Sequence, residues 1–168
     1  MNRPQPDEYA PYYAGYVAAV QDDVLTELAS QAKSFPELLN SIAPDREDFA
    51  PGEGKWTLKE LLGHVIDTER IMTYRALSIA RGEKASLLPF DQDEYVKNSN
   101  YRNQNFAKLI EEFRVLREAN LYLFKSFEEK ELSAKGTANN YSISVRGLLF
   151  VIAGHVNHHR KIITERYL

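Results

Sequence analysis

The chain has 168 residues, of which 43% are hydrophobic and 27% charged. This length and composition are typical of one globular domain spanning residues 1–168 and exclude an intrinsically disordered chain. The formal net charge of −3 and the lack of any run of Lys or Arg exclude a general attraction to polyphosphate, so we expect no nucleic-acid partner. The chain has no cysteine, which excludes disulfides, thiolate metal ligands and a cysteine nucleophile.

The first part of the chain, residues 1–20, is rich in Pro and Tyr and is predicted to form an extended arm, packed as a strap on the surface of the domain. It lacks the charged start and the apolar run of a secretory signal. No stretch of the chain approaches the roughly 18 apolar residues that a membrane span requires. We therefore expect a cytoplasmic protein without a membrane partner.

The first predicted helix runs from about Asp22 to about Ile42, because apolar side chains recur at helical spacing through this segment. Pro36 interrupts the pattern, and Ser34 with Glu37 resembles a capping box, so we expect the helix to kink or restart there. The loop that follows, PDREDFAPGEGK, is rich in residues that favour turns.

The second predicted helix begins at Thr57, which can form a capping box with Glu60, and runs to about Arg81, where Gly82 is a suitable stop. A long connection follows, from about residue 83 to residue 104, without clear periodicity. Connections of this length in compact domains are often functional or strapped across the fold.

Two further helices are predicted from about Asn105 to about Phe127 and from about Ser144 to about Arg166. We find no segment that indicates strand pairing and no internal repeat. Four helices without strands predict an all-α, antiparallel four-helix bundle, with the long connection between its second and third helices.

The four histidines of the chain lie within the second and fourth predicted helices. His64 lies in the second helix, and His155, His158 and His159 lie in the fourth. Residues four apart share one face of a helix, so His155 and His159 can bind the same ion. Neutral imidazole is a good ligand for zinc, nickel, iron or copper.

Spacing alone allows either His158 or His159 to join His155, and the neighbouring residues favour His159. His159 shares an apolar, inward stripe with Leu148 and Ile152, whereas His158 lies nearer the polar side of the helix. We therefore assign His159 as the ligand and His158 to the rim of the site. A single histidine on such a stripe is more often a hydrogen-bonded core residue than a ligand. The pair on one helix and the third histidine on another favour a metal site.

The segments KWTLKELLGHVIDTER and SVRGLLFVIAGHVNHHRKIITERYL resemble the DinB-like superfamily of bacterial metal-binding proteins, and the resemblance extends from about Val20 to Leu168. It implies a four-helix bundle, often a homodimer, that binds a divalent metal through three histidines. The matching positions are His64, His155 and His159. Relatives include metal-dependent transferases that join small thiols such as bacillithiol or mycothiol to other molecules.

Three protein ligands leave coordination positions open, as catalytic metal sites do. Three hypotheses follow: a transferase that uses a low-molecular-weight thiol as its small-molecule substrate, a hydrolase that activates water, and a non-catalytic metal-binding or dimerising protein. Because the chain has no cysteine, a transferred thiol must come from a small molecule. The all-imidazole site accepts both zinc and nickel, so either can be the cofactor.

Two acidic residues of the second helix are candidates for supporting the metal ligands. Asp67, three residues after His64, could accept the second N–H of an imidazole, or it could be a surface carboxylate. Glu69 could be a base or an ion-pair partner of Arg70 or Arg166, and the ion pair is the favoured interpretation.

Four aromatic residues are candidates for lining a pocket for an apolar substrate: Trp56, Tyr74, Phe90 and Tyr95. Aromatic side chains at such positions more often contribute plain packing. We find neither a phosphate-binding glycine loop nor a serine-based catalytic triad in the sequence.

Overall fold

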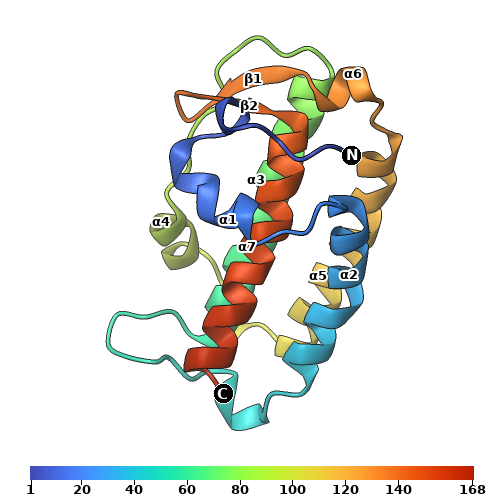
Figure 1. The fold of residues 1–168 in the computed structure, drawn as a ribbon. Coiled ribbons are helices and arrows are strands. Elements are labelled where there is room, and N and C mark those ends of the chain that lie inside the picture. The colour runs from blue at the N-terminus through green and yellow to red at the C-terminus, as the bar shows by residue number, and fades with distance from the viewer.

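Four long helices form a bundle in the computed structural model, which describes residues 1–168 (Figure 1). The long helices are α2 (Val24–Asn40), α3 (Leu58–Ala80), α5 (Phe106–Ser126) and α7 (Val145–Arg166). Short helices are α1 (Ala14–Ala18), α4 (Gln92–Lys97) and α6 (Glu129–Leu132), and two strands are β1 (Lys135–Ala138) and β2 (Tyr141–Ser144). The predicted all-α bundle is confirmed, with a two-stranded sheet added. No helix has the combination of length and apolar character that a membrane span requires.

Side-chain caps fix where the long helices begin. Thr57 and Glu60 form the predicted capping box, since the Thr57 hydroxyl accepts from the Glu60 backbone N–H and the Glu60 carboxylate accepts from the Thr57 backbone N–H at 2.7 Å. Ser144 caps α7 by accepting from the Gly147 N–H at 2.9 Å. Helix α2 continues through Pro36, so the predicted restart of the helix does not occur.

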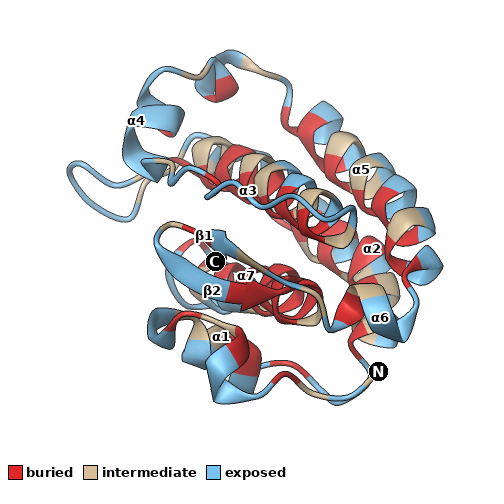
Figure 2. Cartoon of the chain, turned by 90° about the horizontal axis from the view of Figure 1, so that it is seen from above, coloured by how far each residue is buried: buried red, intermediate tan, exposed pale blue.

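Each long helix packs against two others: α2 contacts α5 and α7, and α3 contacts α5 and α7. Helix α1 lies on the side of α7 that the other helices leave open, so that α7 is buried over most of its surface (Figure 2). The buried apolar residues form two clusters, one containing Phe124 and Phe150 and the other containing Phe35 and Phe113. Each of the four long helices also carries buried polar side chains, among them Gln31, Glu69, Arg117 and His155.

The strands β1 and β2 form an antiparallel hairpin, with Ala138 paired to Tyr141 and Lys135 paired to Ser144. The prediction that no strands pair was wrong. The turn consists of Asn139 and Asn140, which both have positive φ, at 50° and 63°, as a two-residue hairpin turn requires. Strands of four residues are too short to show a recognisable alternation, so the sequence pattern does not indicate this hairpin.

The connection between α3 and α5 is strapped across α3 and is partly helical. Asp91 caps α4 by accepting from the backbone N–H groups of Asp93 and Glu94. Further along, the Tyr101 ring lies directly on Gly63 of α3, where an added Cβ would be 2.2 Å from ring atoms. Only glycine permits this close approach, which holds the connection beside the second helix of the bundle.

Residues 1–20 differ from the predicted extended arm, because they form two short 3₁₀ turns and helix α1. Arg3 fixes the segment by donating to the backbone oxygens of Val17 at 2.8 Å and Val20 at 2.6 Å. The Tyr16 carbonyl lies so close to Gly154 of α7 that an added Cβ would be 2.1 Å from its oxygen. The segment is therefore seated on α7, as a strap, beside the histidines of that helix.

Candidate metal centre

Three imidazoles from two helices meet inside the bundle. His64 comes from α3, and His155 and His159 come from successive turns of α7. Their side chains are buried, with 4%, 6% and 6% of their surface exposed. The His155 Nε2 atom lies 3.0 Å from the Nε2 atoms of both His64 and His159. One ligand atom from each residue lies within 4.8 Å of the other two.

The chemistry of this cluster fits a divalent metal ion. A neutral imidazole nitrogen carries either one proton or one lone pair, so the His155 Nε2 atom can hydrogen-bond well to only one of its two close neighbours. The other pair of nitrogens then lies in close contact in a buried position without a well-directed proton between them, which is unfavourable. A cation would accept all three lone pairs at once and would remove this conflict.

Burial keeps the cluster in the neutral form that binds metals. Desolvation, with a smaller contribution from nearby His158, lowers the pKa of His64 from 6.5 to about 4. Desolvation also lowers the pKa values of His155 and His159 well below the usual range, and the neighbouring histidines add to the effect. At neutral pH the three imidazoles therefore present lone pairs and carry no charge.

The lowered pKa of His64 predicts how the metal-free protein responds to acid. The folded state binds a proton at His64 less readily than the unfolded state does, so the stabilising contribution is present above pH 6.5 and is lost as the pH falls toward about 4. We expect His64 to account for about 2 kcal/mol of lost stability between pH 7 and pH 5. Urea unfolding of the chelator-treated protein and of His64→Gln measures this difference. A difference between the two proteins that does not change with pH would contradict it.

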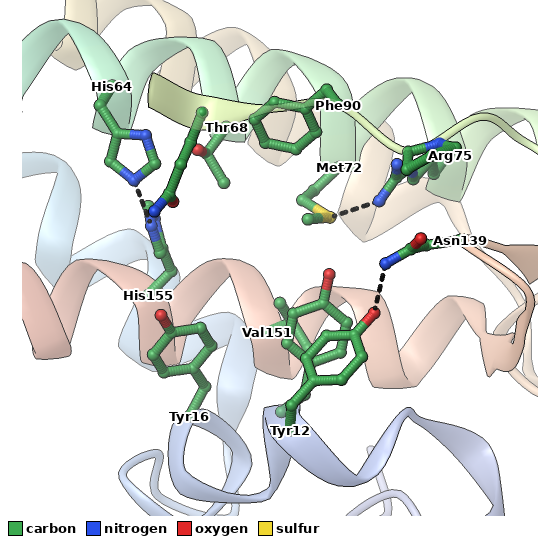
Figure 3. Close-up of a pocket in the computed structure, with 13 residues that line it drawn as sticks. Tyr12, Tyr16, His64, Thr68, Met72, Arg75, Phe90, Asn139, Val151 and His155 are labelled. Atoms are coloured by element: carbon green, nitrogen blue, oxygen red, sulfur yellow. Dashed lines mark hydrogen bonds between the residues drawn. The ribbon is translucent and has the colours of Figure 1, made fainter. Parts of the chain in front are cut away.

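A cavity of about 380 Å³ opens beside the cluster (Figure 3). His64 and His155 lie at one end of it, and Arg75 and Asn139 lie at the other. Its lining comprises Tyr12, Tyr13, Tyr16, His64, Thr68, Met72, Arg75, Pro89, Phe90, Gln92, Asn139, Val151 and His155. No carboxylate belongs to this lining. His159 instead lines a smaller cavity, of about 210 Å³, together with Trp56, Asp93 and Tyr167.

A sequence model of the DinB superfamily matches residues 15–163. The chain belongs to the DinB superfamily. The match includes α2, α3 and α5, most of α1 and α7, and all three clustered histidines. No curated protein sequence matches the chain significantly.

Three solved structures share this fold. One is YfiT from Bacillus subtilis, which is described as a probable metal-dependent hydrolase with an unusual four-helix bundle topology. YfiT is 15% identical in sequence to this chain, and the two structures align with a TM-score of 0.73 over 98% of this chain and 91% of YfiT. The DinB-like protein YjoA from Bacillus subtilis is 17% identical with a TM-score of 0.60, over 86% of this chain and 88% of YjoA. A mycothiol-dependent maleylpyruvate isomerase is 16% identical with a TM-score of 0.65, over 82% of this chain and 57% of the isomerase.

His158 lies outside the histidine cluster of this DinB-superfamily chain. Its side chain is exposed, and its ring centroid is 5.1 Å from that of His159 and 5.3 Å from that of Tyr16. The structure thus places His159 inside the cluster and His158 on its rim, the arrangement that the apolar stripe predicts. Their roles toward a metal stay predictions.

Asp67 contacts no histidine. Its carboxylate accepts a hydrogen bond from the Tyr101 hydroxyl at 2.7 Å and lies 3.6 Å from the Arg70 guanidinium. Desolvation and this carboxylate raise the pKa of Tyr101 above its usual value. Asp67 therefore helps to fix the connection between α3 and α5 and does not accept a proton from an imidazole. The Nδ1 atom of His159 is buried and has no hydrogen-bond partner.

Glu69 forms an ion pair, as favoured from the sequence, but with Arg117 of α5 instead of Arg70 or Arg166. Two hydrogen bonds of 2.7 and 2.8 Å join its carboxylate to the Arg117 guanidinium, and the Asn120 amide donates a third at 3.1 Å. Both partners are almost completely buried, with 2% and 0% of the side chain exposed. Because Arg117 neutralises the carboxylate, Glu69 is not available as a base.

The aromatic candidates divide between the site and the surface. The Trp56 ring lies beside His64, with 4.8 Å between the ring centroids, and Phe90 lines the cavity. Tyr74 is 60% exposed and lies outside the cavity lining. Tyr95 contacts Phe90 but is itself exposed.

Sequence reasoning missed the contribution of the N-terminal segment to the site. Tyr12, Tyr13 and Tyr16 cover the cavity from α1 and the turn before it, and Asn139 reaches it from the hairpin. The only available signal was the density of tyrosines in PYYAGY, which a surface strap explains equally well. Arg75 could have been found, because it lies on the same stripe of α3 as His64.

Proposed function

We propose that this chain binds one divalent metal ion, zinc or nickel, through His64, His155 and His159 and activates a low-molecular-weight thiol for transfer to an electrophile. The observation that carries the proposal is the buried set of three imidazoles, two of which, His64 and His155, lie at the end of an open cavity. A closed, four-ligand site would favour a structural role, whereas three ligands beside a cavity favour a catalytic one.

The metal would supply positive charge at the open side of the histidine cluster, where it lowers the pKa of a thiol or of water. The chain supplies the surroundings. Met72, Phe90 and Val151 give the cavity an apolar wall that excludes water from the sulfur and the electrophile. The Tyr16 hydroxyl is protonated at neutral pH, as that of any tyrosine is, and burial raises its pKa further, so it can donate a hydrogen bond.

The absence of a carboxylate from the cavity lining supports a thiol as the nucleophile. A hydrolytic site commonly uses Asp or Glu to accept a proton from water. Glu69 is paired with Arg117, and Asp67 is paired with Tyr101, so neither of the acids near His64 on α3 serves the cavity. A thiol, with an ordinary pKa of about 8.5, is already partly ionised at neutral pH and has less need of such a base.

Hydrolysis is the second candidate function. The likeness to YfiT, which extends over 98% of this chain, favours it because YfiT is described as a probable metal-dependent hydrolase. A non-catalytic role in metal binding is the remaining alternative. The open cavity beside the histidines makes this role less favoured, because a purely structural site needs no space for a substrate.

A substrate panel separates these functions. The metal-loaded protein is incubated with bacillithiol, mycothiol, glutathione or coenzyme A and with monochlorobimane, so that a sulfur–carbon bond forms as chloride leaves. We expect a metal-dependent rate that falls by about 100-fold or more in His155→Ala and stays near the wild-type rate in His158→Ala. Turnover of esters or amides instead would favour the hydrolase. No turnover in either panel would leave metal binding as the better account.

The homodimer implied by the family resemblance is also a proposal. Light scattering at micromolar concentration measures the mass in solution, and a mass equal to that of one chain would contradict it.

A further inference from the structure

Arg75 is a buried cation without an acidic partner. Its side chain lies on α3 with 3% of the residue exposed. One guanidinium nitrogen donates to the Leu88 carbonyl at 2.6 Å, and another lies 3.7 Å from the Met72 sulfur. The other deeply buried arginine, Arg117, is neutralised by Glu69, whereas none of the ion pairs in the structure includes Arg75. Burying a charge without a counter-ion is costly, so the guanidinium is a strong binding group for an anion.

Arg75 faces the cavity that leads to the histidine cluster. The cavity has the Arg75 guanidinium and the Asn139 amide at one end and the imidazoles of His64 and His155 at the other (Figure 3). The Asn139 amide donates to the Tyr12 hydroxyl at 3.1 Å, which fixes the polar groups of the Arg75 end. The lining between the two ends includes Met72 and Phe90, so an elongated ligand with an apolar middle fits it.

The helix sets the spacing between the two ends. Arg75 follows His64 by eleven residues, which is three turns of α3, so both side chains lie on one face with their backbones about 16 Å apart. Thr68 and Met72, on the intervening turns, line the same cavity. A ligand that contacts both ends must therefore carry its anionic group well away from the atom that reaches the histidines.

We propose that Arg75 is the binding site for a carboxylate at the far end of the substrate. The nucleophile of the proposed transfer is then a thiol that carries a carboxylate. The identity of the ligand as a thiol rests on the proposed function, whereas the carboxylate site rests on Arg75. A guanidinium binds a carboxylate through two parallel hydrogen bonds. The cavity lining has one cation and no acid, so a singly charged carboxylate is neutralised, while a phosphate dianion would leave a buried excess charge.

The test compares 8-mercaptooctanoic acid with 8-mercapto-1-octanol, which differ only in the group at the end distant from sulfur. Calorimetry with the metal-free protein under reducing conditions is expected to show at least about tenfold tighter binding of the acid. Arg75→Gln, which removes the charge and keeps an amide donor, is expected to bind both equally. Arg70→Gln, which changes a half-exposed arginine of the same helix, is expected to keep the preference.

Equal binding of the acid and the alcohol, binding of neither, or a preserved preference in Arg75→Gln would overturn the assignment of Arg75. Circular dichroism and the melting temperature of Arg75→Gln show whether the variant is folded. A second titration uses cobalt-substituted protein, in which sulfur bound to the metal gives a charge-transfer absorption. If the acid is preferred in the metal-free protein but no thiol changes the cobalt spectrum, the proposed transfer fails and the carboxylate site stands.

Discussion

His155→Ala is expected to lose the metal, with its metal content falling to about a tenth of the wild-type content or less. The reason is its central place in the cluster, since its Nε2 atom is the one that lies 3.0 Å from both other Nε2 atoms. The two imidazoles that remain would have to hold the ion from separate helices. Mass spectrometry of elements, on protein purified without a metal-affinity tag, measures the content per chain.

His158→Ala is the matched control, because it removes an imidazole from the same helix at the exposed rim of the site. We expect this variant to keep the wild-type metal content. The ligand assignment fails if His158→Ala loses the metal while His159→Ala retains it. Both variants should keep their helical circular dichroism at 25 °C, because the two apolar clusters of the bundle do not depend on the metal.

Glu69→Leu is expected to reduce the free energy of unfolding by about 3–5 kcal/mol, which is the largest effect on stability that we predict. The substitution leaves the Arg117 guanidinium fully buried without its counter-ion. Of the hydrogen bonds of Arg117, only those to the Gln31 side chain at 2.8 Å and the Leu28 carbonyl at 3.3 Å would remain. Urea unfolding followed by circular dichroism measures the loss.

The double variant Glu69→Leu with Arg117→Met tests whether the buried charge causes this loss. Removing both partners leaves no unpaired charge, so we expect the double variant to be more stable than Glu69→Leu alone. If the losses of the two single variants simply add, the pair does not interact as the structure indicates. The metal content of Glu69→Leu provides a separate readout, and it should stay near the wild-type value because Glu69 contacts no histidine.

Periodicity of apolar residues was sufficient to predict the four long helices. It was also sufficient to place His155 and His159 on one inward face, because their spacing of four residues is a property of a single helix. It could not show which helix faces which. The partner of Glu69 is 48 residues away on α5, and no local pattern distinguishes Arg117 from the surface arginines.

The parts of the site that the sequence did not predict come from segments without regular periodicity. The hairpin depends on the backbone conformation of Asn139 and Asn140, and its strands are too short to show an alternation. Tyr74 and Arg75 are adjacent on α3, but one is exposed and the other lines the cavity, since neighbouring residues on a helix point about 100° apart. The stripe of α3 that Arg75 shares with His64 distinguishes the two residues.

The seating of α1 on α7 has a consequence for how the protein is made. Tyr12 and Tyr16 leave the ribosome before His155 does, yet they line one cavity with it. Until α7 has been synthesised, the N-terminal segment lacks the helix on which it packs, and His64 lacks the other two histidines of the cluster. The cavity and the complete histidine cluster can therefore form only after α7 has been synthesised, so an ion could contact all three imidazoles only from that point on.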